Sequence, residues 1–184
     1  MKRPLLLAVL ALLASVAAGA ASWYAPQRAT RRGVPLPEHK RLLPFVGQWE
    51  GEGKYYLNQV GEPLRLQATE TNRMVGQLWL VSDLETNQMD FASHTVIGYD
   101  PEEGKFIGSF VGSFYPLMSR AEVVENQADR TVITTFRSYN PAGVMVRFKI
   151  VQTWLDDDTR RQEIYATGDD GEQALKSELL LKRK

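Results

Sequence analysis

From Gln48 to the end of the chain, apolar and polar residues alternate in short runs, and turn-forming residues separate these runs. Successive side chains of a β-strand point to opposite faces, so alternation with a period of two is typical of half-buried strands. The intervening segments are rich in Gly, Pro, Asn and Asp, and they are too short to hold a crossover helix. The pattern therefore predicts consecutive antiparallel strands in an up-and-down meander, with no parallel sheet.

Ten strands are expected from this pattern, at about residues 49–57, 64–74, 77–85, 91–99, 106–113, 118–125, 131–139, 144–154, 160–167 and 174–183. An open sheet would leave two strand edges unpaired, and closing it into a barrel removes both edges. A short helical turn is expected before the first strand, because Pro37 suits a first helical position and Pro44 ends the turn. We therefore predict an all-β fold over residues 38–184: a single antiparallel up-and-down β-barrel of about ten strands with a short N-terminal helical turn.

The first expected strand combines one large ring with glycines. Trp49, Gly51 and Gly53 share a face under the alternation. Glycine inside a strand marks a sharp bend or the close approach of other groups, so we expect Gly47 and Gly51 to let this strand curl while Trp49 fills one end of the barrel. Arg183 lies at the end of the inward row of the last strand. It can stack on Trp49 as a cation–π pair worth about 1 kcal/mol, where the barrel closes.

The first residues have the composition of an export signal. Two basic residues precede an apolar run at residues 5–18, and small residues follow. We predict a signal peptide at residues 1–20, with cleavage after Ala20 or alternatively after Ser22. A retained anchor is the other interpretation, although the run is shorter than the roughly 20 apolar residues of a membrane span. Residues 21–37, rich in Pro and Arg, are expected to be a linker. The released protein is then expected in the periplasm or the medium, without membrane insertion.

The charge balance argues against partners that are bound through charge alone. Lys and Arg number 22, and Asp and Glu also number 22. A nucleic-acid-binding domain usually carries a basic excess, so no nucleic-acid partner is expected. The chain has no Cys, which excludes disulfides, thiolate metal sites and a Cys nucleophile. No cofactor or metal is expected, since the acidic turn at residues 156–158 lacks the spaced oxygen ligands of a calcium loop.

The apolar face of the second expected strand continues into Glu70 and Asn72. A buried carboxylate costs free energy unless it is paired or hydrogen-bonded. Three outcomes are therefore open for Glu70. It meets a cation inside, such as Arg120 or Arg161, or a pleat irregularity turns it outward, or it faces a wet cavity.

The candidate ligand-binding residues follow from this reasoning. Glu70 and Asn72 are predicted to be the polar anchors of a ligand inside the barrel. His94, Arg120 and Tyr165 are further candidates, as polar side chains carried by other expected strands.

The chain resembles the lipocalin-type (calycin) barrels, through Gly47-x-Trp49, the helical turn before it and the basic residue that ends the last strand. More closely, it resembles an uncharacterised bacterial family, DUF1579. The matching segments are Pro37-Glu38-His39-Lys40 with Leu43, Val46-Gly47-x-Trp49-Glu50-Gly51, Thr69-Glu70-Thr71-Asn72-Arg73-Met74, Gly98-Tyr99-Asp100 and Arg183-Lys184. The resemblance covers about residues 37–184. It implies a lipocalin-like barrel and no particular reaction, since none is assigned to that family.

The predicted function follows from the barrel. A barrel of about eight to ten strands can enclose one small ligand, and small-molecule sites are mostly apolar with a few polar groups. Eight rings fall on expected strands, and about half should face inward: Trp79, Phe91, Phe106, Phe110, Phe136, Phe148, Trp154 and Tyr165. Either these rings line a cavity or they fill the core completely. The prediction is non-catalytic binding of a small, largely apolar molecule in the barrel interior.

Two alternatives remain at this point. One is a haem-binding barrel similar to the nitrobindins, which begin with a similar Gly-x-Trp-x-Gly-x-Gly stretch and carry a haem-ligating His near the chain end. Here no His follows His94, and the only other His is His39. The second alternative is an enzyme that uses Glu70 together with Glu122 or Glu163. The sequence has no Gly-x-Ser-x-Gly elbow and no His-Glu-x-x-His motif.

Overall fold

The computed structural model describes residues 33–57, 61–87, 90–114, 116–140, 142–168 and 171–184. The chain divides into two units, residues 1–34 and 35–184, and every described helix and strand belongs to the second unit. The predicted signal peptide, its two candidate cleavage positions and residues 21–32 of the predicted linker lie outside the described residues. Among the residues that are described, no helix has both the length and the apolar character needed to span a membrane.

A short helical segment precedes ten strands. The elements are α2 (Pro37–Lys40), the 3₁₀ turn η1 (Leu43–Phe45), β1 (Gly47–Tyr55), β2 (Leu64–Val75), β3 (Trp79–Thr86), β4 (Ala92–Asp100), β5 (Lys105–Gly112), β6 (Ser119–Asn126), β7 (Thr131–Tyr139), β8 (Met145–Trp154), β9 (Thr159–Thr167) and β10 (Gln173–Arg183). All ten predicted strands are present, and each end lies within two residues of its predicted position.

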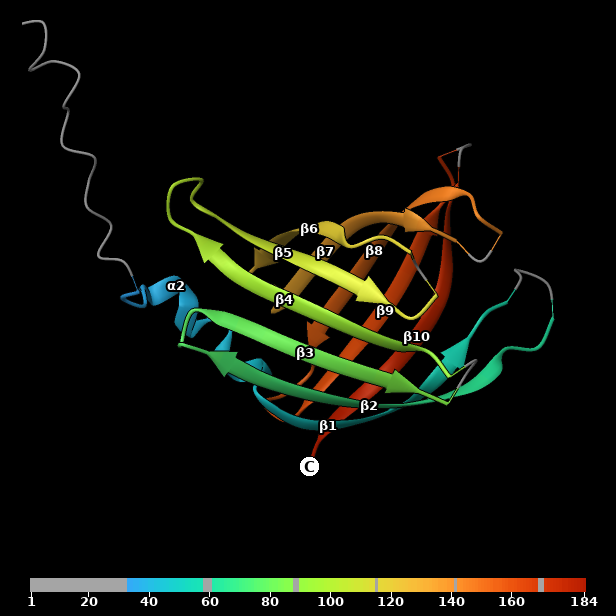
Figure 1. Ribbon diagram of the computed structural model, residues 1–184. Coiled ribbons are helices and arrows are strands. Elements are labelled where there is room, and N and C mark those ends of the chain that lie inside the picture. Colours follow the sequence, from blue (N-terminus) through green and yellow to red (C-terminus); the bar gives the residue numbers. More distant parts are fainter. Residues whose placement is uncertain (1–32, 58–60, 88–89, 115, 141, 169–170) are drawn as a thin grey trace, which may run out of the picture. The chain divides into compact units, whose positions relative to one another are not determined.

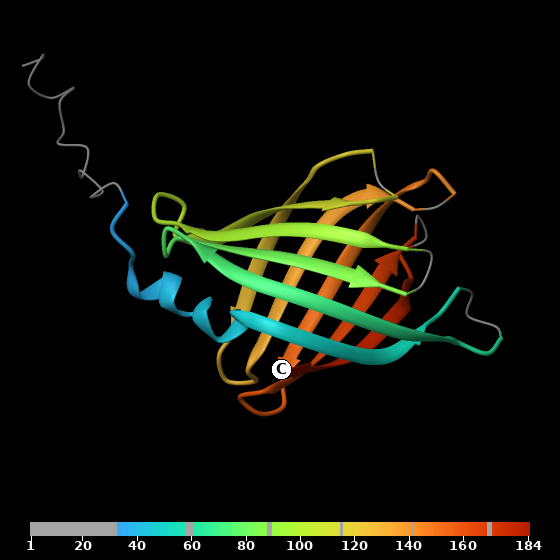
Figure 2. The ribbon, with the colours of Figure 1, turned by 60° about the horizontal axis from the view of Figure 1, so that its bottom comes forward.

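Each strand pairs antiparallel with its neighbours in the chain, and β1 also pairs with β10 (Figure 1). The sheet is therefore a closed barrel, as predicted. α2 and η1 lie at the barrel end where β1 begins (Figure 2). We call this end, with Phe45 and Trp49, the capped end. The opposite end, at the connections that follow β1, β3, β5, β7 and β9, is called the mouth.

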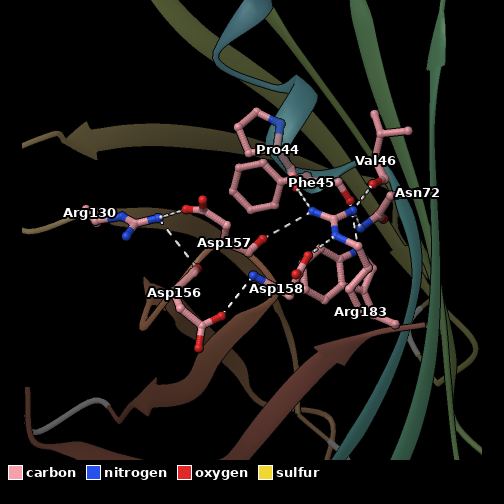
Figure 3. A network of polar contacts seen from close by, with 10 residues as sticks. Pro44, Phe45, Val46, Asn72, Arg130, Asp156, Asp157, Asp158 and Arg183 are labelled. Atoms are coloured by element: carbon pink, nitrogen blue, oxygen red, sulfur yellow. Dashed lines mark hydrogen bonds and ion pairs between the residues drawn. The ribbon is translucent and has the colours of Figure 1, made fainter.

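The predicted stacking of Arg183 on Trp49 is present at the capped end. The two residues are register partners between β1 and β10, and the Arg183 guanidinium carbon lies 4.3 Å from the centroid of the Trp49 ring. Arg183 also donates hydrogen bonds to the carbonyls of Pro44, at 2.8 Å, and of Val46 (Figure 3). One arginine therefore joins the last strand to the first strand and to the turn that covers the barrel end.

The acidic turn between β8 and β9 binds arginines. Asp158 accepts a hydrogen bond of 2.9 Å from Nε of Arg183, and Asp157 accepts one of 2.9 Å from Arg130 (Figure 3). Asp156 accepts the backbone N–H of Asp158, and this bond holds the pKa of the Asp156 carboxyl below its usual value. Asp157 and Asp158 thus connect this turn to the β6–β7 connection and to the end of β10, and Asp156 stabilises the turn itself.

Glycines on β1 stand where β10 passes close. Gly47 has φ +132°, a conformation that L side chains rarely adopt, and a Cβ there would lie 2.8 Å from Nη1 of Arg183. A Cβ on Gly51 would lie 2.9 Å from a methyl of Leu181, and one on Gly53 would lie 1.8 Å from the carbonyl oxygen of Glu178. The strand therefore curls against its partner, as the run of glycines predicted.

Candidate ligand-binding cavity

The barrel encloses a cavity of about 920 Å³. Small-molecule sites typically measure about 300–1,000 Å³. Leu42 and Phe45 line the cavity at the capped end, and Leu57 and Phe114 line it at the mouth. Because Leu57 is 56% exposed and Phe114 is 42% exposed, the cavity reaches solvent at the mouth. The barrel is hollow, so the alternative of a completely filled core is wrong.

Most side chains that line the cavity are apolar. Six of the eight rings considered from the sequence are among them: Phe91, Phe106, Phe110, Phe136, Phe148 and Trp154. Three of these rings form a stack, with centroids 4.3 Å apart between Phe110 and Phe136 and 5.4 Å apart between Phe136 and Phe148. Trp79 instead lies on the outer face against Gly98, where a Cβ would come within 2.3 Å of its ring. The expectation that half of the rings face inward was too low.

A bulge in β10 changes which residues face the cavity. The pairing of β10 with β9 shifts between Leu175 and Ser177. Ala174 lines the cavity on one side of this bulge and Leu179 lines it on the other, whereas Leu175 does not. Strict alternation along β10 would place Leu175 on the same face as Leu179, but the extra residue of the bulge reverses the alternation.

A buried carboxylate lies at the capped end of the cavity. Glu70, on β2, is only 4% exposed and lines the cavity. Its Oε1 accepts hydrogen bonds from Arg160 at 2.6 Å, from Asn72 at 2.5 Å and from Ser82 at 3.1 Å. Glu70 is therefore ion-paired inside the barrel, which is the first of the three outcomes considered for it, and it also borders the cavity.

The cation that pairs with Glu70 is Arg160, not Arg120 or Arg161. Arg160 has no exposed side-chain surface, and its guanidinium carbon lies 4.7 Å from the centroid of the Trp49 ring. The rings of Phe45 and Trp154 are 5.5 and 6.0 Å away. Its Nε and Nη1 find no hydrogen-bond acceptor among the described residues, and the aromatic faces provide a favourable environment for this charge.

Arg160 lies two residues after the acidic turn at residues 156–158 and was not among the predicted site residues. A signal was available, since Ile164 and Ala166 are the apolar pair of the same strand. Extending their alternation backwards places Gln162 and Arg160 on the inward face. Both Gln162 and Arg160 are buried in the structure.

Asn72 holds the cluster in place. Its Nδ2 donates to the carbonyl of Phe45 at 2.9 Å as well as to Glu70. The same carbonyl accepts a hydrogen bond from Nε1 of Trp49 at 2.9 Å. Asn72 does not line the cavity, so it positions Glu70 and the η1 turn rather than a ligand directly.

The other three predicted anchors do not line the cavity. His94 is exposed on β4, with its Nδ1 2.6 Å from a carboxylate oxygen of Asp83. Arg120 is exposed on β6, and its Nη2 lies 3.6 Å from a carboxylate oxygen of Glu103. Tyr165 donates to Glu163 at 3.2 Å on the outer face. The strand alternation turns all three outward, so they are not placed to contact a ligand in the barrel interior.

The cavity wall includes neither histidine and neither of the two carboxylates considered as partners of Glu70. The chain has two His, of which His94 is outside and His39 is buried in α2, where its Nδ1 accepts the backbone N–H of Leu36 at 2.9 Å. Neither one lines the cavity, so neither is placed to ligate a haem iron there. Glu122 and Glu163 do not line it either, so no pair with Glu70 forms. Within the part of the chain that the structure describes, no cluster of three or more His, Asp or Glu residues could hold a metal ion.

These features define the class of protein: a closed, ten-stranded antiparallel β-barrel with a hollow and largely apolar interior. The chain belongs to the family described as "Protein of unknown function (DUF1579)", whose model matches residues 34–183, and this confirms the resemblance seen in the sequence. A similar solved structure is the crystal structure of Rv2717c from M. tuberculosis, with a TM-score of 0.58 and 10% identity over 82% of this chain and 99% of that chain. At that identity the similarity concerns the fold alone. No curated protein matches the sequence.

Proposed function

We propose that this protein is an exported barrel that binds one small, largely apolar molecule in its interior, without catalysis. The observation that carries the proposal is the cavity of about 920 Å³, lined mainly by aliphatic and aromatic side chains. Transfer of apolar surface from water into such a cavity is favourable by about 25 cal/mol per Å². Glu70, the one carboxylate that is buried among the described residues, supports binding rather than acid–base chemistry, because it is already engaged with Arg160 and Asn72.

The mouth offers a route for an apolar molecule. Large apolar side chains are exposed around it on the connections and strand ends, namely Leu57, Leu64, Phe114, Leu117, Met118 and Val144. Phe91 stands just inside, with its ring centroid 5.6 Å from that of Phe114. This apolar rim continues into the apolar wall of the cavity and offers an apolar ligand a path inward, beside Glu172 and Lys176, which also line the mouth.

The binding proposal is tested with the neutral fluorophore N-phenyl-1-naphthylamine, whose emission rises in apolar sites. Protein purified after export in a bacterial host is expected to enhance the emission saturably at one molecule per chain. Ser93→Trp should abolish the enhancement, because Ser93 lines the cavity near the mouth. Ala92→Trp is the matched control, since Ala92 is the next residue on β4 and is exposed on the outer face. Native mass spectrometry of the same sample should show a co-purified small molecule.

Equal enhancement by both variants would place the fluorophore outside the barrel and contradict the proposal. The export part has its own readout, which is the intact mass of the protein recovered from the periplasmic fraction. A chain that begins after Ala20 or Ser22 is expected. A full-length chain in the membrane fraction would instead support a retained anchor.

A further inference from the structure

We propose that the capped end of the cavity selects apolar molecules that end in a neutral hydrogen-bond donor, such as a long-chain alcohol, and that Oε2 of Glu70 accepts this donor. The inference rests on the proposed function, because it assumes that the cavity binds an apolar molecule. It goes further by naming the polar group of the ligand and the atom that recognises it.

The two oxygens of the Glu70 carboxylate are hydrogen-bonded unequally. The donors of Arg160, Asn72 and Ser82 all converge on Oε1, at 2.6, 2.5 and 3.1 Å. No described residue donates a hydrogen bond to Oε2. The side chain is 4% exposed and lines the cavity, so this acceptor is shielded from bulk water. An ionised carboxylate can accept at both oxygens, and a buried acceptor gains most from a new donor.

The charged side chains at the capped end of the cavity are paired with one another. Arg160 is buried at 2.6 Å from Glu70, so the pair adds no net charge. The other charged side chains that line the capped end are also ion-paired: Arg41 with Glu125, and Arg130 with Asp157 of the neighbouring turn. A ligand carboxylate would add an unpaired negative charge against Oε2, and a ligand ammonium would add an unpaired positive charge near Arg160. Either addition is costly in a poorly solvated site, whereas a hydroxyl adds no charge.

A hydrogen-bond donor, Gln162, also faces the cavity from β9. Gln162 lies two residues after Arg160 on β9, so it faces inward one step nearer to the mouth. It is buried, lines the cavity and accepts a hydrogen bond from Gln152 at 2.8 Å. Its Nε2 has no acceptor among the described residues and is available to the oxygen of a ligand. A hydroxyl group both donates and accepts, so it matches an acceptor such as Oε2 of Glu70 and a donor such as Nε2 of Gln162.

The test compares four ligands with one alkyl chain: 1-dodecanol, its methyl ether, dodecanoate and dodecylammonium. Each one competes with N-phenyl-1-naphthylamine for the wild-type protein. The ether cannot donate a hydrogen bond. The alcohol is therefore expected to bind roughly tenfold more tightly than the ether, since a hydrogen bond to a charged group contributes a free energy of about this size. Both charged ligands are expected to bind more weakly than the alcohol. This comparison needs no variant.

Glu70→Gln assigns the preference to one atom. The three donors require an oxygen at the Oε1 position, so the amide nitrogen of the introduced side chain takes the place of Oε2. The ratio of the affinities for the alcohol and the ether should then fall to about one. Circular dichroism verifies that the variant is folded. Glu125→Gln is the matched control, because it changes a carboxylate that lines the same end of the cavity, and it should keep the preference.

The outcomes separate the inference from the proposed function. Equal affinity of the wild type for alcohol and ether, or tighter binding of either charged ligand, overturns the inference and leaves apolar binding intact. Failure of all four ligands to displace the fluorophore, or of the fluorophore to bind, overturns the proposed function itself. A preference that persists in Glu70→Gln shows that another group accepts the donor, and this also overturns the inference.

Discussion

Trp49 is the residue on which the contacts of the capped end converge. Its ring lies under the guanidinium groups of Arg160 and Arg183 and makes an edge contact with Trp154, with centroids 5.6 Å apart. Its indole nitrogen donates to the carbonyl of Phe45. The side chain is 1% exposed, so nearly all of its apolar area is removed from water on folding. Its truncation would leave a cavity and remove the ring that both cations contact.

We expect Trp49→Ala to lower the free energy of unfolding by about 3–5 kcal/mol, as truncations of large buried aromatic residues do. Equilibrium urea unfolding followed by circular dichroism measures this change. Trp79→Ala is the matched control, because Trp79 is 38% exposed on the outer face, and it should cost less than half as much. Similar losses for the two variants would show that Trp49 does not hold the capped end together.

Tyr55, at the mouth, provides a test that depends on pH. Burial raises the pKa of its phenol above the usual value near 10.0. A raised pKa in the folded state stabilises the protein fully below the unfolded pKa, and this contribution is lost as the pH rises through the folded pKa. Tyr55→Phe should therefore leave the melting temperature nearly unchanged at pH 8 and reduce its fall above pH 10. An identical alkaline fall in both proteins would contradict this placement of the phenol.

The contrast between Arg183 and Arg160 shows which residue contacts could be predicted from sequence. Arg183 ends the last strand, and Trp49 begins the first, so barrel closure alone brings them together. Arg160 reaches Glu70 across the barrel interior, between β9 and β2, which are not neighbours in the sheet. Alternation indicates which side of a strand a residue faces, but it does not indicate which inward residues meet. His94, Arg120 and Tyr165 are a different case, because the alternation of their own strands places them on the outer face.

At the scale of elements, the strands were well predicted and their irregularities were not. The bulge in β10 and the turn between β2 and β3 are the two clear departures. The third strand was expected from residue 77 and begins at Trp79, because Gly76 and Gln77 both have φ +60°. Positive φ at both central residues is the mark of a type I′ hairpin turn, which favours Asn or Gly. Gln77 gives no such signal in the sequence.

This turn leads to a stabilising substitution. A non-glycine residue in the left-handed region costs about 1 kcal/mol or more, so Gln77→Gly should raise the free energy of unfolding by roughly 0.5–1 kcal/mol. Gly76→Ala should have the opposite sign, since a Cβ there meets no atom within 4 Å and only the backbone strain acts. Thermal melts of the two variants measure the difference. A lower melting temperature for Gln77→Gly would rule out this account of the turn.

For the whole molecule, the defining event is closure between the first and last strands. β1 pairs with β10 from Trp49–Arg183 to Tyr55–Ser177, and these contacts join residues more than a hundred positions apart. The other neighbouring strands are joined by short connections and can pair locally. Contacts of large sequence separation carry a large loop-closure entropy, so closure is expected to come late in folding. Closure also creates the cavity, because the inward side chains of the ten strands do not fill the space that the closed barrel encloses.

Late closure makes a kinetic prediction for Arg183. Arg183→Ala removes the contacts with Trp49, Pro44, Val46 and Asp158, with an expected loss of about 2 kcal/mol. If these contacts form after the transition state, the whole loss appears in the unfolding rate, which rises about thirtyfold while the folding rate is unchanged.

Stopped-flow chevron plots against urea separate the two rates for Arg183→Ala. Lys184→Ala is the control from the same strand end. Its ammonium pairs with Glu50 at 2.6 Å on an exposed surface, where such a pair contributes less than about 1 kcal/mol. A slower folding rate with an unchanged unfolding rate for Arg183→Ala would contradict late closure. It would mean that β1 and β10 are already paired in the transition state.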